Sequence, residues 1–257
     1  MYNPFPNSSL IRLGSGSGDP MNVGLKRRPS KARLHFLIVN CFTGINLLLG
    51  LVAVIAAASG SLELAAALVL LSTVFDGCDG PLARRWQVAS AFGAHFDSLA
   101  DMTSFIVAGG ALAYFWLDPA ETSLPSLIVV AVSSAYVLAG AIRLARFNTI
   151  PPQTGYFQGM PTTVTAAIVA SNLLIHPALA DKWIVGLILL LSVLMVSVFP
   201  YPKLSSLMPR FPNWCFPLVL LGALVNLPWT LGVATSLYVC SGPLITARRR
   251  YAAGRAD

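Results

Sequence analysis

The sequence predicts an all-α polytopic integral membrane protein with about eight transmembrane helices and both termini in the cytoplasm. Of the 257 residues, 56% are hydrophobic and only 11% are charged, whereas soluble domains contain about 25% charged residues. The apolar residues fall in long blocks with short breaks between them, and the basic residues gather on one side of these blocks. These observations exclude a disordered chain and argue strongly against a soluble globular enzyme.

Eight apolar blocks meet or approach the roughly 20 helical residues that a bilayer core requires. Ser59-Gly60-Ser61 separates the first two blocks, Pro151-Pro152 separates the fourth from the fifth, and Pro228 marks the last turn. Gly and Pro interrupt helices because one is flexible and the other lacks a backbone N–H. The predicted spans are residues 34–58, 62–84, 92–117, 125–147, 161–179, 183–200, 212–227 and 229–246.

The distribution of basic residues predicts the orientation. With eight spans, both termini lie on one side together with the second, fourth and sixth connections, and that side carries 16 of the 17 Lys and Arg residues. Only Lys182 lies opposite. Because cytoplasmic loops are enriched in Lys and Arg, the termini are predicted to be cytoplasmic, in the inner or plasma membrane of a cell.

The same count defines three parts of the chain. Residues 1–33 are predicted to be a flexible basic cytoplasmic tail, residues 34–246 the membrane domain, and residues 247–257 a basic cytoplasmic tail. The basic residues of the tails set the topology and also attract the anionic headgroups of membrane lipids. No separate basic domain is present, so no nucleic-acid partner is expected.

Four of the ten acidic residues lie in apolar context at the predicted cytoplasmic ends of the second and third spans. A carboxylate within a membrane costs about 2.5–3.5 kcal/mol on insertion scales, so such residues indicate a function. Helical spacing places Asp76 and Asp79 on one stripe of the second span, and Asp97 and Asp101 on one stripe of the third. The short connection makes these spans antiparallel neighbours, so the four carboxylates are predicted to face one another.

Carboxylates gathered in this way repel one another unless cations lie between them. Oxygen ligands without His or Cys suit Mg²⁺ or Mn²⁺, and two such ions can clamp the attacking and leaving oxygens of a phosphoryl displacement. Arg84 follows on the second span, where it can meet a phosphate. The residues therefore predict metal-dependent phosphoryl chemistry at the cytoplasmic membrane surface. The alternative is a carboxylate cluster that only packs helices through Arg84 and Arg85.

The second and third spans carry a motif that resembles the signature of the CDP-alcohol phosphotransferases: Asp76-Gly-Cys-Asp79-Gly80-Pro-Leu-Ala83-Arg84, eight residues, Gly93, three residues, Asp97, three residues, Asp101. The resemblance implies a helical membrane core, a homodimer and a site with two divalent metal ions facing the cytoplasm. It implies that the four aspartates hold the metals and that Asp101 also takes the proton from the acceptor alcohol. The residues that it places around CDP-diacylglycerol are Asp79, Gly80, Ala83, Arg84, Ser90 and Gly93.

Within that family, the chain resembles the phosphatidylserine synthase branch over roughly residues 40–205. Ile106 and Gly109 depart from the pattern, because Gly and Pro are expected there. The resemblance implies the transfer of a phosphatidyl group from CDP-diacylglycerol to L-serine, with release of CMP. The similar runs are Asp97-Ser-Leu-Ala-Asp-Met-Thr-Ser-Phe105, Arg143-Leu-Ala-Arg-Phe-Asn148, Tyr156-Phe-Gln-Gly-Met-Pro161, and Leu194-Met-Val-Ser197 followed by Tyr201-Pro202.

Three residues at the end of the fourth span are candidates for contact with the acceptor or with phosphate: Arg143, Arg146 and Asn148. Either arginine can pair bidentately with the serine carboxylate or with a lipid phosphate, and Asn148 can add an amide contact. The alternative is that the two arginines only anchor the span at the cytoplasmic surface.

Other functions remain open on the sequence alone. The same chemistry could use choline, glycerol 3-phosphate or inositol phosphate as the acceptor. A membrane transporter or channel could use the carboxylates as an ion path, although its acids would then be spread across the bilayer depth. An inactive scaffold would bind nucleotide and lipid without turnover.

Overall fold

The computed structural model describes residues 30–117, 122, 124–149, 156–202, 222, 226, 228–239 and 241. Within them the protein is helical apart from one short antiparallel pair of strands, a pair that the all-α prediction did not include. The strands are β1 (Tyr156–Gln158) and β2 (Pro200–Pro202), and residues 228–239 are also helical. The other helical elements are α1 (Ser30–Ala58), α2 (Leu62–Arg85), α3 (Ala91–Asp101), the π-helical turn η1 (Met102–Val107), α4 (Ala108–Trp116), α5 (Ser126–Thr149), α6 (Thr162–Ile175) and α7 (Asp181–Val196).

Three helical segments of the described part are long and apolar enough to cross a membrane: α1, the continuous run Ala91–Trp116, and α5. Large apolar side chains stand exposed along these helices, which is unfavourable in water and favourable against lipid tails. The structure therefore supports a helical membrane protein. Examples of these exposed side chains are Leu37, Leu51 and Ile55 on α1, and Leu127, Val130 and Leu138 on α5.

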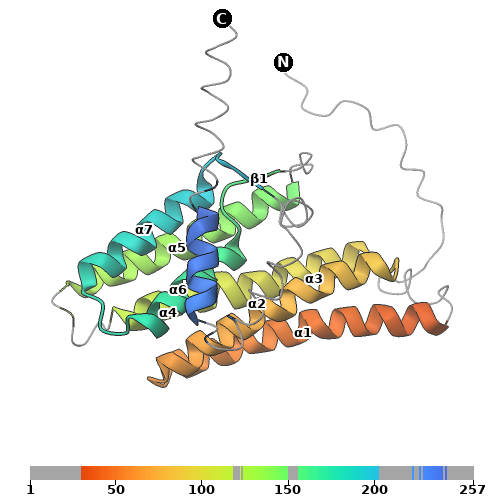
Figure 1. Ribbon diagram of the computed structural model, residues 1–257, viewed down its shortest axis with the longest axis horizontal. Coiled ribbons are helices and arrows are strands. Elements are labelled where there is room, and N and C mark those ends of the chain that lie inside the picture. Colours follow the sequence, from red (N-terminus) through yellow and green to blue (C-terminus); the bar gives the residue numbers. More distant parts are fainter. Residues whose placement is uncertain are drawn as a thin grey trace, which may run out of the picture.

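α1 and α2 form an antiparallel hairpin in one half of the molecule (Figure 1). The turn between them contains Gly60 with a φ of +81°, a left-handed conformation that glycine adopts without strain. Behind the turn, Ala53 and Ala57 of α1 and Ala65 and Ala66 of α2 are fully buried. Such small side chains let helix backbones approach closely where no hydrophobic effect drives association in lipid.

The third predicted span, residues 92–117, is one continuous helical run, but it is not a regular α-helix. It consists of α3, the π-helical turn η1 and α4. The run packs on α1 along its whole length, and its α4 part also packs on α5. The change of helical period falls immediately after Asp101.

The other half of the molecule contains α5, α6 and α7, with α5 packed on α7 and α6 packed on α2 (Figure 1). Two predicted spans are shorter than the sequence suggested. The span expected at 161–179 ends as a helix at Ile175, because His176 precedes Pro177 and a residue before proline disfavours the α conformation. The span expected at 183–200 ends at Val196, since Ser197 is extended and the chain then enters β2.

The β1–β2 pair ties the start of α6 to the end of α7. Gln158 pairs with Pro200, and the N–H of Gly159 donates to the carbonyl oxygen of Phe199 at 3.0 Å. Gly159 has a φ of +76°, and a side chain there would collide with the backbone carbonyls of Met195 and Ser197. This position therefore requires glycine for both conformation and space.

Several predictions concern residues outside those described. Of the span predicted at 212–227 only residues 222 and 226 are described, and of that predicted at 229–246 the helical stretch 228–239 and residue 241. The tail of residues 247–257 and residues 1–29 lie outside as well. α1 begins at Ser30, four residues before the predicted start of the membrane domain at residue 34, because Lys31, Ala32 and Arg33 favour helix.

Candidate active site

The aspartates of α2 and α3 meet, as their helical spacing predicts. Asp76 of α2 and Asp97 and Asp101 of α3 each offer a carboxylate oxygen, and these oxygens all lie within 4.8 Å of one another. Asp79 is close to this cluster: it interacts electrostatically with Asp76 and Asp97, and it lines a pocket together with Asp97. All four predicted acids therefore belong to one site, with Asp79 at the side that opens into the pocket.

The cluster has the properties of a cation site. One carboxylate oxygen of Asp97 and one of Asp101 (Oδ1 in each) are buried and lack a hydrogen-bond partner among the described residues. Asp97 and Asp101 also experience repulsion from Asp76. Buried carboxylates of this kind are costly unless a cation balances them, and an all-oxygen ligand set fits Mg²⁺ or Mn²⁺. These residues could therefore hold a divalent metal ion.

Two hydroxyl groups from other helices orient the aspartates. Thr43 of α1 donates a hydrogen bond to Asp79 Oδ2 at 2.7 Å, and Thr163 of α6 donates to Asp76 Oδ2 at 3.4 Å. Neither residue was among the site residues predicted from the sequence. A single threonine in an apolar helix also occurs as a packing residue, so only the folded arrangement shows which acid it serves. In the sequence, Thr43 follows the 3.6-residue period with Val39 and Asn46, a spacing that indicates a shared helix face.

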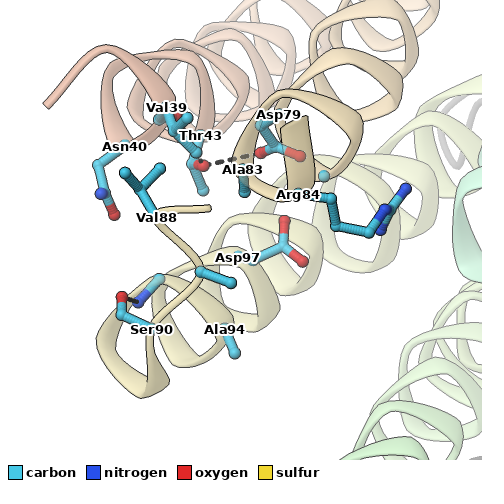
Figure 2. Close-up of a pocket in the computed structure, with 13 residues that line it drawn as sticks. Val39, Asn40, Thr43, Asp79, Ala83, Arg84, Val88, Ser90, Ala94 and Asp97 are labelled. Carbon is cyan, nitrogen blue, oxygen red and sulfur yellow. Dashed lines mark hydrogen bonds between the residues drawn. The ribbon is translucent and has the colours of Figure 1, made fainter. Parts of the chain in front are cut away.

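A pocket of about 200 Å³ adjoins the aspartates, between α1, α2 and the start of α3 (Figure 2). Asp79, Arg84 and Asp97 line one side of it, and Asn40 and Ser90 lie toward the other (Figure 2). All six residues predicted around CDP-diacylglycerol line this pocket, and α1 adds Val39, Asn40 and Thr43, which were not predicted. The complete lining is Val39, Asn40, Thr43, Asp79, Gly80, Ala83, Arg84, Val88, Ala89, Ser90, Gly93, Ala94 and Asp97.

The short turn between α2 and α3 contributes Val88, Ala89 and Ser90 to the lining of the pocket. The N–H of Val88 donates to the carbonyl of Ala83 and that of Gln87 to the carbonyl of Arg84, the paired hydrogen bonds of a Schellman motif. Gln87 occupies the left-handed position, with a φ of +55°, where glycine is the usual residue. Ser90 then begins α3, because its side chain accepts a hydrogen bond from the N–H of Gly93 at 3.0 Å. Ser90 therefore has a capping role as well as a place in the pocket wall.

The three candidate acceptor contacts do not come together. Arg143 of α5 is buried, interacts electrostatically with Asp101, and has a buried Nε without a hydrogen-bond partner among the described residues. Arg146 instead donates to the carbonyl oxygen of Val196 at the end of α7, at 3.0 Å. Asn148 accepts a hydrogen bond from Ser98 at 3.1 Å, and both line a separate groove between α3 and α5.

A family model described as CDP-alcohol phosphatidyltransferase matches residues 36–199. The chain belongs to the CDP-alcohol phosphatidyltransferase family. The matched region extends from α1 to the residues just before β2, and so contains every residue of the aspartate cluster and the pocket. The aspartates thus lie within the region that matches the model of an enzyme family, which favours a catalytic role for them over an ion path.

Curated relatives within the phosphatidyltransferase family match most of the chain. A protein of Helicobacter pylori named CDP-diacylglycerol--serine O-phosphatidyltransferase is 34% identical over 80% of this chain and 90% of its own length. One of Bacillus subtilis with the same name is 30% identical over 63% of this chain and 87% of its own. The archaetidylserine synthase of Methanothermobacter thermautotrophicus is 32% identical over 63% of this chain and 68% of its own.

Proposed function

We propose that this phosphatidyltransferase moves the phosphatidyl group of CDP-diacylglycerol to the hydroxyl group of L-serine, forming phosphatidylserine and CMP. The observation that carries the proposal is the oxygen-only cluster of Asp76, Asp97 and Asp101, which opens through Asp79 into a pocket that contains Arg84. The names of the relatives point to serine as the acceptor and CDP-diacylglycerol as the donor.

The four aspartates would hold two divalent ions, Mg²⁺ or Mn²⁺, and such ions when bound neutralise charge on the transferring phosphoryl group and on the departing CMP. Asp79, Gly80, Ala83, Arg84, Ser90 and Gly93 bind the cytidine diphosphate part of the donor, with the exposed guanidinium of Arg84 directed to its phosphates.

Asp101 acts as the general base. It takes the proton from the serine hydroxyl, and the serine oxygen then forms a bond to the phosphorus attached to diacylglycerol while the bond from that phosphorus to the CMP oxygen breaks. Arg143, which interacts electrostatically with Asp101, holds the serine carboxylate beside this base. Arg146 and Asn148 are also predicted to contact the acceptor. To do so, each would have to exchange its present hydrogen-bond partner, Val196 or Ser98, for the acceptor.

We propose the predicted topology for the same protein: eight spans, both termini cytoplasmic, and the site at the cytoplasmic edge of the membrane. In support, Arg84 and Arg85 end α2 and Arg143 and Arg146 lie near the end of α5. These are the helix ends where the positive-inside rule expects basic residues. A homodimer is proposed from the resemblance to the family.

The proposed reaction is tested by offering acceptors singly to the purified protein with CDP-diacylglycerol and Mn²⁺ or Mg²⁺. L-serine, choline, glycerol 3-phosphate and inositol phosphate are compared by release of CMP and by mass spectrometry of the lipid product. Of the four acceptors, we expect rapid CMP release only with serine, and we expect phosphatidylserine as the lipid product. Faster CMP release with another alcohol than with serine would overturn the assignment of serine as the acceptor. The absence of CMP with every alcohol would overturn the assignment of transferase activity.

Gly80→Ala is expected to weaken binding of CDP-diacylglycerol without harming the fold. A Cβ at Gly80 would meet no atom closer than Arg84 Nη1 at 3.5 Å, so the protein accommodates it, but the methyl group occupies space in the donor pocket. The KM for CDP-diacylglycerol should rise about tenfold, since overpacking a fitted site costs about 1–3 kcal/mol. Gly77→Ala is the matched control: Gly77 is exposed, a Cβ there meets nothing within 4 Å, and it does not line the pocket. Equal KM values for both variants would contradict the placement of the donor.

A further inference from the structure

The helical run that carries Asp97 and Asp101 changes its period directly after Asp101. In η1 the turns are wider than in an α-helix, and the N–H of Ala108 donates to the carbonyl of Thr103, five residues back. Such turns are rare in helices and frequent at functional sites. Each residue of an α-helix turns the side-chain direction by about 100° around the helix axis. One extra residue in a turn therefore changes by about this angle which faces the segments before and after it present. The turn therefore decides which direction the end of α3 faces when α4 is packed in the core.

Neighbouring helices fit the π-helical turn closely. Ser104 donates a hydrogen bond to the backbone carbonyl of Asn46 on α1 at 2.7 Å, and a side chain at Gly50 on α1 would collide with the backbone of Ser104. On the opposite side, a Cβ at Gly140 of α5 would come within 2.8 Å of Ile106. Ile106 stands where the resemblance predicted glycine, and Gly140 supplies the missing space on the facing helix.

Tyr136 of α5 makes a second polar contact with the π-helical turn, from inside the protein core. Its side chain is fully buried, and its hydroxyl donates to the carbonyl oxygen of Phe105 at 3.3 Å. The same hydroxyl also has Thr165 Oγ1 as an acceptor at 3.2 Å, so its one proton is shared between Phe105 and Thr165, while Thr165 itself donates to the carbonyl of Thr162. A Cβ at Gly109 would approach the Tyr136 hydroxyl to 2.7 Å. The glycine at the position where proline was expected therefore makes room for this contact.

We propose that the η1 turn sets the direction of the Asp101 carboxyl group and that Tyr136, through the Phe105 carbonyl, is a positioning residue for the aspartate cluster. The inference rests on the proposed role of the aspartates as metal ligands. Tyr136 touches none of the four acids in the described contacts; it acts through the turn that begins one residue after Asp101.

The proposal predicts that Tyr136→Phe weakens metal binding although the ring remains in place. Without the hydroxyl, the Phe105 carbonyl loses its external donor and the turn is held less firmly. We expect about a fivefold rise in the Kd for Mn²⁺, which corresponds to the loss of one ordinary buried hydrogen bond. The Kd is measured on the detergent-solubilised full chain, without lipid substrate, from the electron paramagnetic resonance signal of free Mn²⁺.

Thr165→Val provides the matched control. It removes the other neighbour of the Tyr136 hydroxyl and leaves Phe105 as its acceptor, so Mn²⁺ should bind as tightly as in the wild type. Equal weakening in Tyr136→Phe and Thr165→Val, or no weakening in Tyr136→Phe, would overturn the positioning role. Weakening in Tyr136→Phe alone supports it even if the protein proves inactive with serine, because the readout contains no acceptor. A wild-type protein that binds no Mn²⁺ would overturn both the positioning role and the proposed metal site.

Discussion

Asp101→Asn should lower kcat for phosphatidyl transfer by about 10²- to 10⁴-fold, the usual contribution of a positioned general base. Asparagine has nearly the same shape, and its side-chain oxygen can still face Asp76 and Asp97. It cannot accept the proton of the serine hydroxyl, and it removes one negative charge from the cluster of oxygens that lie within 4.8 Å of one another. The rate loss should therefore persist when Mn²⁺ is saturating.

The experiment separates the two roles proposed for Asp101. The Kd for Mn²⁺ is measured first, and kcat is then compared at Mn²⁺ concentrations well above the Kd of each variant. Asp181→Asn is the control, because Asp181 lies in the first turn of α7 and accepts a hydrogen bond from Thr122 at 2.5 Å, away from the cluster. Full turnover of Asp101→Asn at saturating Mn²⁺ would remove the base assignment and leave only a role in metal binding.

The sequence was sufficient to predict the aspartate cluster for a simple geometric reason. Asp76 and Asp79, and likewise Asp97 and Asp101, are separated by intervals that place them on one side of a helix. The connection between α2 and α3 is too short for anything but an antiparallel pair. A carboxylate is also so costly in apolar surroundings that its placement carries information about function. Burial and repulsion in the structure agree with this reasoning.

What the sequence could not reveal depends on contacts between distant segments. Thr43 and Thr163 reach the acids from α1 and α6, and their partners are 36 and 87 residues away. The π-helical turn has no periodic signal, because the six residues 102–107 suit either helical period. Strands of three residues, one of them with two prolines, are too short to leave an alternating pattern.

The acceptor contacts illustrate the same limit. Arg143, Arg146 and Asn148 are close in sequence and lie on the last turns of α5, yet they face three different environments. Successive turns of a helix present residues at different angles, so neighbours along the chain need not share a site. Only Arg143 is both buried and close enough to Asp101 to interact with it electrostatically.

Arg143→Met should therefore reduce selection of serine as the acceptor. The kcat/KM for serine is expected to fall about 10- to 100-fold, because hydrogen bonds to charged groups contribute about 1.5–3 kcal/mol. Methionine is a long apolar side chain that fills similar space beside Phe147, over whose ring the guanidinium carbon lies at 5.9 Å. The change thus removes the charge while preserving most of the packing.

Ethanolamine supplies the matched comparison, since it is serine without the carboxylate. If Arg143 holds that carboxylate, Arg143→Met should slow serine transfer and leave the rate measured with ethanolamine at high concentration nearly unchanged, so that the ratio of the two kcat/KM values falls about 10- to 100-fold. If Arg143 instead only balances the charge of Asp101, both acceptors should slow together and the ratio should stay constant. A constant ratio would therefore contradict the carboxylate contact, and the guanidinium would have to act on the base alone.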